Sequence, residues 1–333
     1  MTSPALPQDV LFDDGDALPD IPVCDHYCGV EARMRKALAL QAEMGPVFDI
    51  TLDCEDGAPV GGEAEHAALC AELALSADNR FGRVAARLHP YDHPAFEADV
   101  ATLVGRAGHR LAFVMLPKPR HLADVQQALA HIAEVARRAG HARALPVHAL
   151  VETHGALRDV QAIAALPGLE SLSFGLMDFV SAHRGAIPHT AMGVQGQFTH
   201  PLVVRAKLEI AAACHAAAKV PSHCVVTEFK DERALAEAAT RAAREFGYTR
   251  MWSIHPAQIP VIVEAFAPST AEVDEAIEII LAAQAADWAP IRHRDALHDR
   301  ASYRYFWQVI ARARRTGQPL PAEVAAALFG DLA

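Results

Sequence analysis

Short apolar segments alternate with helical segments along most of this chain, and this alternation constrains the fold more than any other feature. Segments with the length and apolar content of β-strands are residues 47–53, 83–89, 111–117, 145–152, 169–175, 222–228 and 249–255, with an earlier one expected at 21–26. They are apolar almost throughout, as parallel strands are when both faces of the sheet are covered. Strands that alternate with helices predict an α/β fold with a parallel sheet.

The segments between the strands carry helical signals. In residues 121–138 apolar side chains recur every three or four positions, which is the stripe of an amphipathic helix. Asp231 is expected to cap the helix that follows it, and Ser269 with Glu272 is expected to form a capping box.

Eight strand-and-helix repeats with polar residues at many strand ends favour a closed (β/α)8 TIM barrel. No glycine-rich dinucleotide turn or P-loop follows a strand, which weakens the alternative of an open, doubly wound sheet. Beyond residue 268 the alternation stops, and helices are expected at 270–286, 301–315 and 321–330. The predicted organisation is an irregular N-terminal arm (1–20), a TIM-barrel catalytic domain (21–268) and a helical C-terminal extension (269–333).

Charge and hydropathy exclude several classes of partner. The 30 basic and 41 acidic residues give a net charge of −11, which argues against a protein that tracks nucleic-acid phosphates. No apolar run approaches the roughly 18 residues that span a bilayer. The acidic, proline-containing N-terminus resembles neither a signal nor a transit peptide. We predict a cytoplasmic protein with a small-molecule substrate and without nucleic-acid or membrane partners.

The six cysteines do not show the spacing of a disulfide framework. Cys24 and Cys28 flank His26, but no second Cys/His pair at matching spacing accompanies them as a zinc site requires. We therefore expect free, buried or half-buried thiols. Neither a G-x-S-x-G turn nor a cysteine in a recognisable catalytic context supports serine or thiol nucleophile chemistry.

Charged or polar side chains stand at the ends of six of the eight expected strands. They are Asp53, Glu55 and Asp56, then Arg87, Lys118, Glu152, Asp178 and His255. The carboxyl ends of barrel strands meet at one rim, where barrel enzymes keep their chemistry. Because a lone desolvated charge costs several kcal/mol, so many charges next to apolar strands predict a common polar site.

Glu152 and Asp178 are the most informative of these residues. They lie 26 positions apart, which is about one strand-plus-helix repeat, so neighbouring parallel strands would bring both carboxylates to the rim. Two carboxylates with room for water suit Mg²⁺, which shares its other positions with water and substrate. The alternative is that both acids form structural ion pairs at the rim.

Six short motifs occur in a fixed order. They are D-x-E-D-G at Asp53–Gly57, R-x-H-P at Arg87–Pro90, P-K at Pro117–Lys118, E-T-x-G at Glu152–Gly155, F-G-x-x-D at Phe174–Asp178 and I-H-P-x-Q at Ile254–Gln258. In this order they resemble the citrate lyase beta-subunit-like branch of the HpcH/HpaI aldolase superfamily, which includes malyl-CoA and citramalyl-CoA lyases. The resemblance covers roughly residues 20–285.

The resemblance implies a (β/α)8 barrel, assembled as a homotrimer or homohexamer, that cleaves or forms a carbon–carbon bond with Mg²⁺, Mn²⁺ being the alternative cation. Glu152 and Asp178 would bind the metal, and Arg87 would hold the substrate carboxylate or carbonyl. The implied reaction cleaves a 3-hydroxyacyl-CoA such as malyl-CoA or citramalyl-CoA to an acyl-CoA plus glyoxylate or pyruvate. Its reverse is a Claisen-type condensation.

The supporting residues leave alternatives open. For Arg87 the alternative to binding substrate is a salt bridge to Glu55 or Asp56. These two acids are expected to orient Arg87 or a water, with ligation of the metal as the alternative. Lys118 is expected to neutralise this acidic cluster or to contact substrate. His255 is expected to fix, with Pro256, the turn after the last strand.

The C-terminal region departs from the family pattern. The acid/base aspartate that the CoA lyases carry in a glycine-containing C-terminal segment has no match, so no aspartate is assigned that role. The Arg/His-rich residues 292–300 are expected to be a solvated helix face, with contact to CoA phosphates as the alternative. Other functions consistent with the sequence are a class II-type aldolase acting on free hydroxy-keto acids, an acyl-CoA thioesterase at the same metal site, and a non-catalytic barrel subunit of a larger complex.

Overall fold

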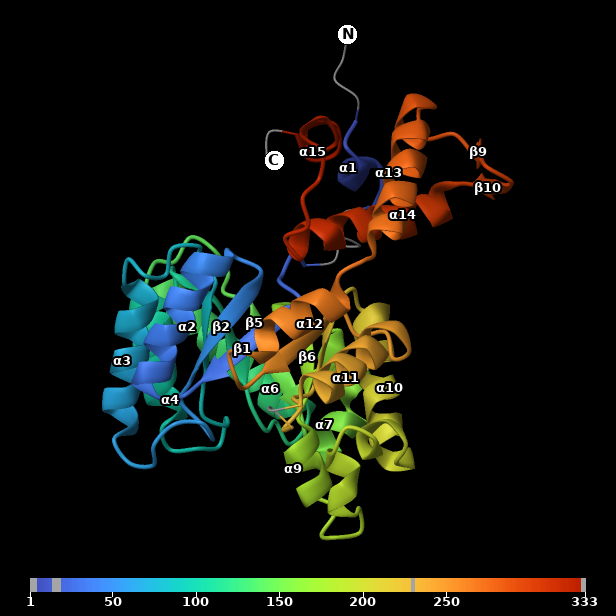
Figure 1. Ribbon diagram of the computed structural model, residues 1–333. Coiled ribbons are helices and arrows are strands. Elements are labelled where there is room, and N and C mark those ends of the chain that lie inside the picture. The colour runs from blue at the N-terminus through green and yellow to red at the C-terminus, as the bar shows by residue number, and fades with distance from the viewer. Residues whose placement is uncertain (1–4, 14–18, 229–230, 331–333) are drawn as a thin grey trace. The chain divides into compact units, whose positions relative to one another are not determined.

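The computed structural model describes residues 5–13, 19–228 and 231–330. The chain divides into two compact units, of which one comprises Ile21–Phe266 and the other Met1–Asp20 together with Ala267–Ala333 (Figure 1).

The unit formed by Ile21–Phe266 is a closed barrel of eight parallel strands in chain order, in which β8 pairs with β1. The strands are β1 (Cys24–Cys28), β2 (Phe48–Asp53), β3 (Val84–Arg87), β4 (Leu111–Leu116), β5 (Val147–Val151), β6 (Leu169–Phe174), β7 (Val220–His223) and β8 (Arg250–Ser253). The predicted TIM-barrel fold is confirmed.

Helices connect the strands and surround the sheet (Figure 1). They are α2 (Glu31–Met44), α3 (Glu63–Leu75), α4 (Phe96–Asp99), η1 (Val100–Val104), α5 (Gly105–Ala107), α6 (Leu122–Arg138), α7 (His154–Arg158), α8 (Val160–Ala164), α9 (Leu176–Ser181), η2 (His189–Met192), η3 (Gly196–Phe198), α10 (Pro201–Ala216), α11 (Glu232–Arg244) and α12 (Gln258–Phe266). The Asp231 side chain caps α11 as expected, because it accepts hydrogen bonds from the backbone N–H groups of Arg233 and Ala234.

The seventh strand lies earlier than the sequence indicates. It was expected at 222–228, but β7 spans Val220–His223 and contains Pro221, whose carbonyl accepts a hydrogen bond from Thr249 N at 3.2 Å. A proline lacks an N–H, so it ordinarily argues against the interior of a strand. Cys224 and Val226, which follow, are buried without pairing in the sheet, and the carbonyl of Val226 accepts a hydrogen bond from the Gln258 amide at 2.7 Å.

An ion cluster holds three adjacent strands together inside the barrel. The Arg250 guanidinium in β8 lies 2.7 Å from Asp49 of β2 and 3.2 Å from Asp25 of β1, and it donates to the carbonyl of Pro22 at 2.6 Å. Arg250 is 1% exposed. Burial of a guanidinium lowers its pKa, but the two carboxylates raise it above the usual value, so Arg250 keeps its charge.

His26 lies in β1, where burial excludes its charged form. Its Nδ1 is 2.8 Å from the Ser253 hydroxyl. Burial is the main cause that lowers the pKa of His26 from 6.5 to about 4.

This shift predicts a loss of stability in acid. As the pH falls, the histidine of the unfolded chain takes up its proton before the buried His26 of the folded chain does. The contribution of His26 to the free energy of unfolding is therefore fully present above pH 6.5 and is lost as the pH falls to about 4. The shift corresponds to roughly 3 kcal/mol. Between pH 7 and pH 4, a His26→Gln variant should therefore lose less of its free energy of unfolding than the wild type, by about that amount, in urea titrations. His109→Gln, at an exposed position, is the control, and equal acid losses in wild type and His26→Gln would contradict the prediction.

The other unit combines an N-terminal helix with the C-terminal region. It contains α1 (Pro7–Leu11), α13 (Thr270–Ala285), α14 (Arg300–Arg315), α15 (Ala322–Phe329) and the strands β9 (Ile291–His293) and β10 (Ala296–His298). Trp307 of α14 donates its indole N–H to the Gln8 side chain at 2.9 Å, and Arg304 donates to the carbonyl of Leu11 at 2.7 Å. Helix α1 therefore packs on α14, although its segment was expected to be irregular. The Ser269–Glu272 capping box is present.

The Arg/His-rich segment is not the helix that was expected. Residues 291–298 form an antiparallel hairpin, in which Arg294 adopts φ = 50° at the turn. Helix α14 begins only at Arg300, because the Asp299 side chain accepts the N–H groups of Ala301 and Ser302. The segment is mostly exposed, and Arg292 lies 3.2 Å from Asp295.

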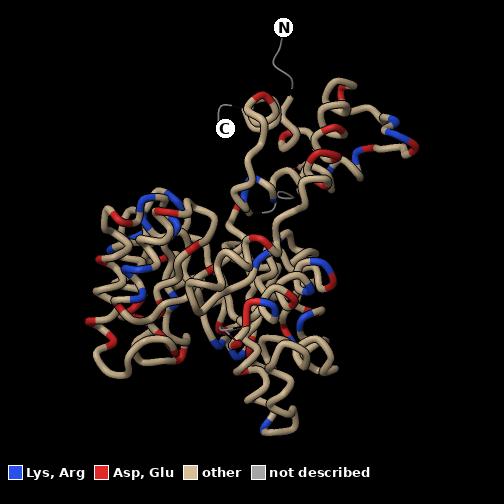
Figure 2. Tube along the Cα trace, viewed as in Figure 1, with Lys and Arg blue, Asp and Glu red and all other residues tan. Residues whose placement is uncertain are grey.

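Acidic and basic residues are interspersed along both units (Figure 2). Within the described ranges, none of the helices has both the length and the apolar character needed to cross a membrane.

Candidate active site

The chain turns around the Asp53 side chain where β2 ends. The carboxylate of Asp53 accepts hydrogen bonds from Glu55 N at 2.9 Å and from Gly57 N at 2.8 Å. A Cβ at position 57 would overlap this carboxylate, so the close approach requires glycine. The turn places Glu55 and Asp56 at the C-terminal ends of the strands.

Arg87 lies opposite Asp53 at the last paired position of β2 and β3. Its Nε and Nη2 donate to the Asp53 carboxylate at 2.7 and 2.5 Å, and its Nη1 lies 3.0 Å from Glu55 Oε2. Burial lowers the pKa of Arg87, but Asp53 and Glu55 raise it above its usual value. The salt bridge between Arg87 and Glu55, which was the alternative to a substrate-binding role for Arg87, is present. The main partner of Arg87 is Asp53, to which the sequence analysis assigned no role.

The Lys118 ammonium binds the acids of the neighbouring loops. Its Nζ lies 2.5 Å from Glu55, 2.8 Å from Asp56 and 3.8 Å from Asp178. Burial lowers the pKa of Lys118, but hydrogen bonds to Asp56 and Glu55 raise it above its usual value. Burial raises the pKa of Asp56, and the bond to Lys118 lowers it below the usual value. In this arrangement Lys118 neutralises the acidic cluster.

The backbone of Lys118 adopts an unusual conformation. Its φ of 49° lies in the left-handed region, although it is not glycine and precedes Pro119. Such a conformation costs about 1–3 kcal/mol and is typical of functional sites. It accompanies a hydrogen bond from Lys118 N to Glu152 Oε1 at 2.8 Å.

Glu152 and Asp178 form the acidic side of the site. Glu152 follows β5, is 2% exposed, and packs so closely on Gly175 that a Cβ there would overlap it. Burial, and after it the negative charge of Asp178, raise the pKa of Glu152 well above its usual value. The Asp178 side chain, in the first turn of α9, is 44% exposed. Among the described residues no ion pair is formed with Glu152.

The six candidate residues therefore come from the ends of five successive strands and meet in one place. These residues are Glu55, Asp56, Arg87, Lys118, Glu152 and Asp178. His255 instead serves a turn, in which its Nδ1 accepts from Ala257 N at 3.2 Å and its own N–H donates to Gln258.

A pocket of about 750 Å³ is lined by residues of α9, η2 and α11. It is lined by Met177, the neighbour of Asp178, and by polar residues that include Thr190, Glu228 and Arg233. Its volume is in the range of small-molecule sites. The sequence did not indicate these residues, because they belong to no recognisable motif.

A closed parallel barrel with an ionic cluster at the carboxyl ends of its strands defines a barrel enzyme. The family model described as HpcH/HpaI aldolase/citrate lyase matches residues 36–256, and the chain therefore belongs to this family. In sequence the chain is 28% identical over 250 residues to the L-malyl-CoA/beta-methylmalyl-CoA lyase of Cereibacter sphaeroides, which covers 71% of this chain and 77% of that relative.

Solved structures agree with this placement. A citrate lyase crystal structure from Burkholderia xenovorans LB400 is 57% identical, covers 98% of this chain and 99% of its own, and superimposes with a TM-score of 0.83. A second solved structure is that of the CitE protein of Mycobacterium tuberculosis in complex with magnesium, acetoacetate and coenzyme A. It is 23% identical, covers 89% of this chain and 98% of its own, and superimposes with a TM-score of 0.65, so it shares the fold. The predicted family is confirmed, and the protein is an enzyme of a family of lyases.

Proposed function

We propose that this protein is a Mg²⁺-dependent carbon–carbon lyase that acts on a 3-hydroxyacyl-CoA thioester with a free carboxylate. Malyl-CoA and citramalyl-CoA are the model substrates, and the products are an acyl-CoA and glyoxylate or pyruvate. The relatives named as malyl-CoA lyases support the acyl carrier and the reaction type. The finding that carries the proposal is the buried carboxylate of Glu152 beside Asp178 at the barrel rim.

The donor set of Glu152 and Asp178 fits a hard divalent cation. Both side chains offer oxygen ligands, and the described residues provide no ion pair that neutralises Glu152. A buried carboxylate next to a second one is electrostatically unfavourable unless a cation is shared between them. Because Asp178 is 44% exposed, water and substrate could complete the coordination, as Mg²⁺ prefers.

Arg87 and Lys118 supply the positive side of the site. The Arg87 contacts to Asp53 and Glu55 fix the plane of the guanidinium, which has N–H groups beyond those contacts for a substrate carboxylate. Lys118 stays protonated between Glu55 and Asp56. We therefore assign Glu55 and Asp56 the role of holding these two cations in place.

The proposed cleavage balances without a co-reactant. The carbinol hydroxyl loses its proton and becomes the carbonyl of the keto acid, while the electron pair of the broken bond passes to the thioester enolate, which takes up a proton. When bound, Mg²⁺ supplies Lewis-acid stabilisation of the oxygen charge that develops. Arg87 orients the substrate carboxylate so that the bond that breaks lies next to this charge-stabilising region.

The test is release of glyoxylate or pyruvate, trapped as the hydrazone, from a panel of malyl-, citramalyl- and other 3-hydroxyacyl-CoA thioesters with and without Mg²⁺. We expect metal-dependent release from at least one thioester. Release that persists in excess chelator would refute the proposed mechanism. Free hydroxy-keto acids belong in the same panel, since activity on them alone would favour the class II-type aldolase reaction.

We also infer a homotrimer or homohexamer, the assembly that the resemblance to the family implies. Light scattering of the purified protein measures this directly, and a monomer would contradict it.

A further inference from the structure

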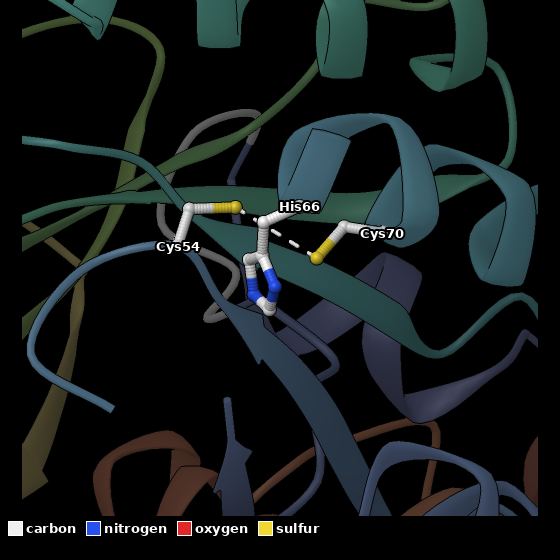
Figure 3. Close-up of side chains that lie close together, drawn as sticks. All are labelled: Cys54, His66 and Cys70. Carbon is white, nitrogen blue, oxygen red and sulfur yellow. Dashed lines mark hydrogen bonds between the residues drawn. The ribbon is translucent and has the colours of Figure 1, made fainter. Parts of the chain in front are cut away.

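Two cysteines and a histidine meet where β2 ends and α3 begins to pack on it (Figure 3). Cys54 follows Asp53, while His66 and Cys70 lie one helical turn apart on the same face of α3. The two sulfur atoms are 3.7 Å apart, and the potential ligand atoms of all three residues lie within 4.8 Å of one another. Both cysteines are buried, and His66 is half-buried.

The sulfur separation matches that of two thiolates on one tetrahedral cation. With Zn–S bonds of about 2.3 Å, a tetrahedral angle places two sulfur ligands about 3.8 Å apart. The separation in the protein is 3.7 Å, which also suits an S–H···S hydrogen bond. The orientation of the histidine therefore decides between the two interpretations.

The His66 ring is oriented as metal-binding histidines are. Its Nε2 lies 2.9 Å from the backbone carbonyl of Asp53, and because a carbonyl only accepts, the proton must be on Nε2. This leaves Nδ1 as the nitrogen for the two sulfur atoms. Metal-ligating histidines almost always donate their other N–H to a carbonyl or carboxylate in this way.

We propose that Cys54, His66 and Cys70 form a binding site for a soft divalent cation, for which Zn²⁺ has the matching chemistry. Two thiolates and an imidazole are ligands that Zn²⁺ prefers, whereas Mg²⁺ prefers oxygen. A water would complete the four ligands of a tetrahedral zinc ion. The site is separate from Glu152 and Asp178 in both residues and ligand chemistry.

A thiolate is the form of cysteine that binds metals. Cys214, on α10, is buried as Cys54 and Cys70 are but lies outside this cluster, so it serves as the matched control.

The cation would connect α3 to the turn that carries Asp53 and Glu55. Because a ligand that binds only the folded protein stabilises it by mass action, Zn²⁺ should raise the thermal midpoint of the barrel.

The experiment uses the full chain, reduced and freed of metal, and titrates it with Co²⁺ as a spectroscopic probe. Cobalt bound to cysteine gives a thiolate-to-metal charge-transfer band in the near ultraviolet, which carboxylate ligands do not give. We expect the band to saturate at one equivalent per chain and to disappear on addition of Zn²⁺. It should be lost in Cys70→Ser, weakened at least about tenfold in Co²⁺ affinity in His66→Gln, and retained in the matched control Cys214→Ser.

Three results would overturn the proposal: no band in the reduced wild type, a band unchanged in Cys70→Ser, or unchanged Co²⁺ affinity in His66→Gln. The half-buried His66 gives a second variant if Cys70→Ser does not fold. If the reduced protein does not bind Co²⁺ and mild oxidant lowers the number of titratable thiols from six to four, Cys54 and Cys70 would be a redox pair instead of a metal site. Glu152→Gln should keep the Co²⁺ band, because Glu152 is not a ligand of this site. The band does not depend on turnover, so failure of the proposed lyase reaction and failure of this metal site can be told apart.

Discussion

Replacing Glu152 with glutamine should lower Mg²⁺-dependent kcat/KM by at least about 10²- to 10³-fold, the usual effect of removing a group that stabilises transition-state charge. Glutamine has the same shape, and its amide oxygen can keep the bond to Lys118 N, which is 2.8 Å long for Glu152. It lacks the charge that would hold the cation. The fold should be intact, since the change removes a buried charge that lies near Asp178.

The measurement is kcat/KM over a Mg²⁺ titration with the thioester that the wild type cleaves. Glu170→Gln is the matched control, because Glu170 lies in β6 at the opposite end of the strands and pairs with His148 at 2.8 Å. We expect near-wild-type activity from it. A Glu152→Gln variant that retains wild-type kcat/KM would remove Glu152 from the metal site.

Replacing Arg250 with methionine should destabilise the barrel by about 3–5 kcal/mol, because the buried carboxylates of Asp25 and Asp49 would lose the guanidinium that they share. Among the described residues, Asp49 would keep only Arg83, whose Nη1 lies 3.9 Å away. Both acids are at most 1% exposed, so water cannot replace the guanidinium. The free energy of unfolding from urea titrations is the measurement. Adding Asp49→Asn to Arg250→Met should recover part of the loss, since it removes one of the two buried charges that lose the guanidinium.

Arg137→Met is the matched control for Arg250→Met. Arg137 is 72% exposed and pairs with Glu134 at 2.8 Å, and exposed ion pairs contribute at most about 1 kcal/mol. Equal destabilisation by the two changes, or strict additivity of Arg250→Met and Asp49→Asn, would contradict the coupling of the buried cluster.

The fold was predictable because the alternation of apolar strands and amphipathic helices repeats eight times, and errors of a few residues do not change it. The strand that differs most from its expected position is β7, which contains Pro221, whereas the expected strand at 222–228 included a buried loop of apolar residues. The hairpin at 291–298 was missed because its turn depends on a left-handed Arg294 rather than on glycine.

The candidate site was predictable as a set because parallel strands bring their carboxyl ends to one rim. The sequence did not predict which of these residues contact one another, because the contact of Arg87 with Asp53 depends on the register of β2 and β3. The backbone of Lys118 gave no signal, because a positive φ leaves no mark in the sequence of a lysine.

The cysteines show the same limit most clearly. Cys24 and Cys28 are close in sequence and were the pair considered for metal, yet their sulfur atoms contact Ser253 and the carbonyl of Thr51 at 3.9 and 4.0 Å. The three residues that do meet, Cys54, His66 and Cys70, bridge a strand end and a helix, so their spacing reflects a loop length and matches no known pattern.

The pairing of α1 with α14 has a consequence for the order in which the protein matures on the ribosome. Residues 5–13 emerge well before residues 300–315, so α1 must wait, without its packing partner, while the whole barrel is synthesised. Domains generally fold as units during synthesis. The barrel can therefore reach its native contacts first, and the helical unit forms last, when the C-terminal helices have been translated.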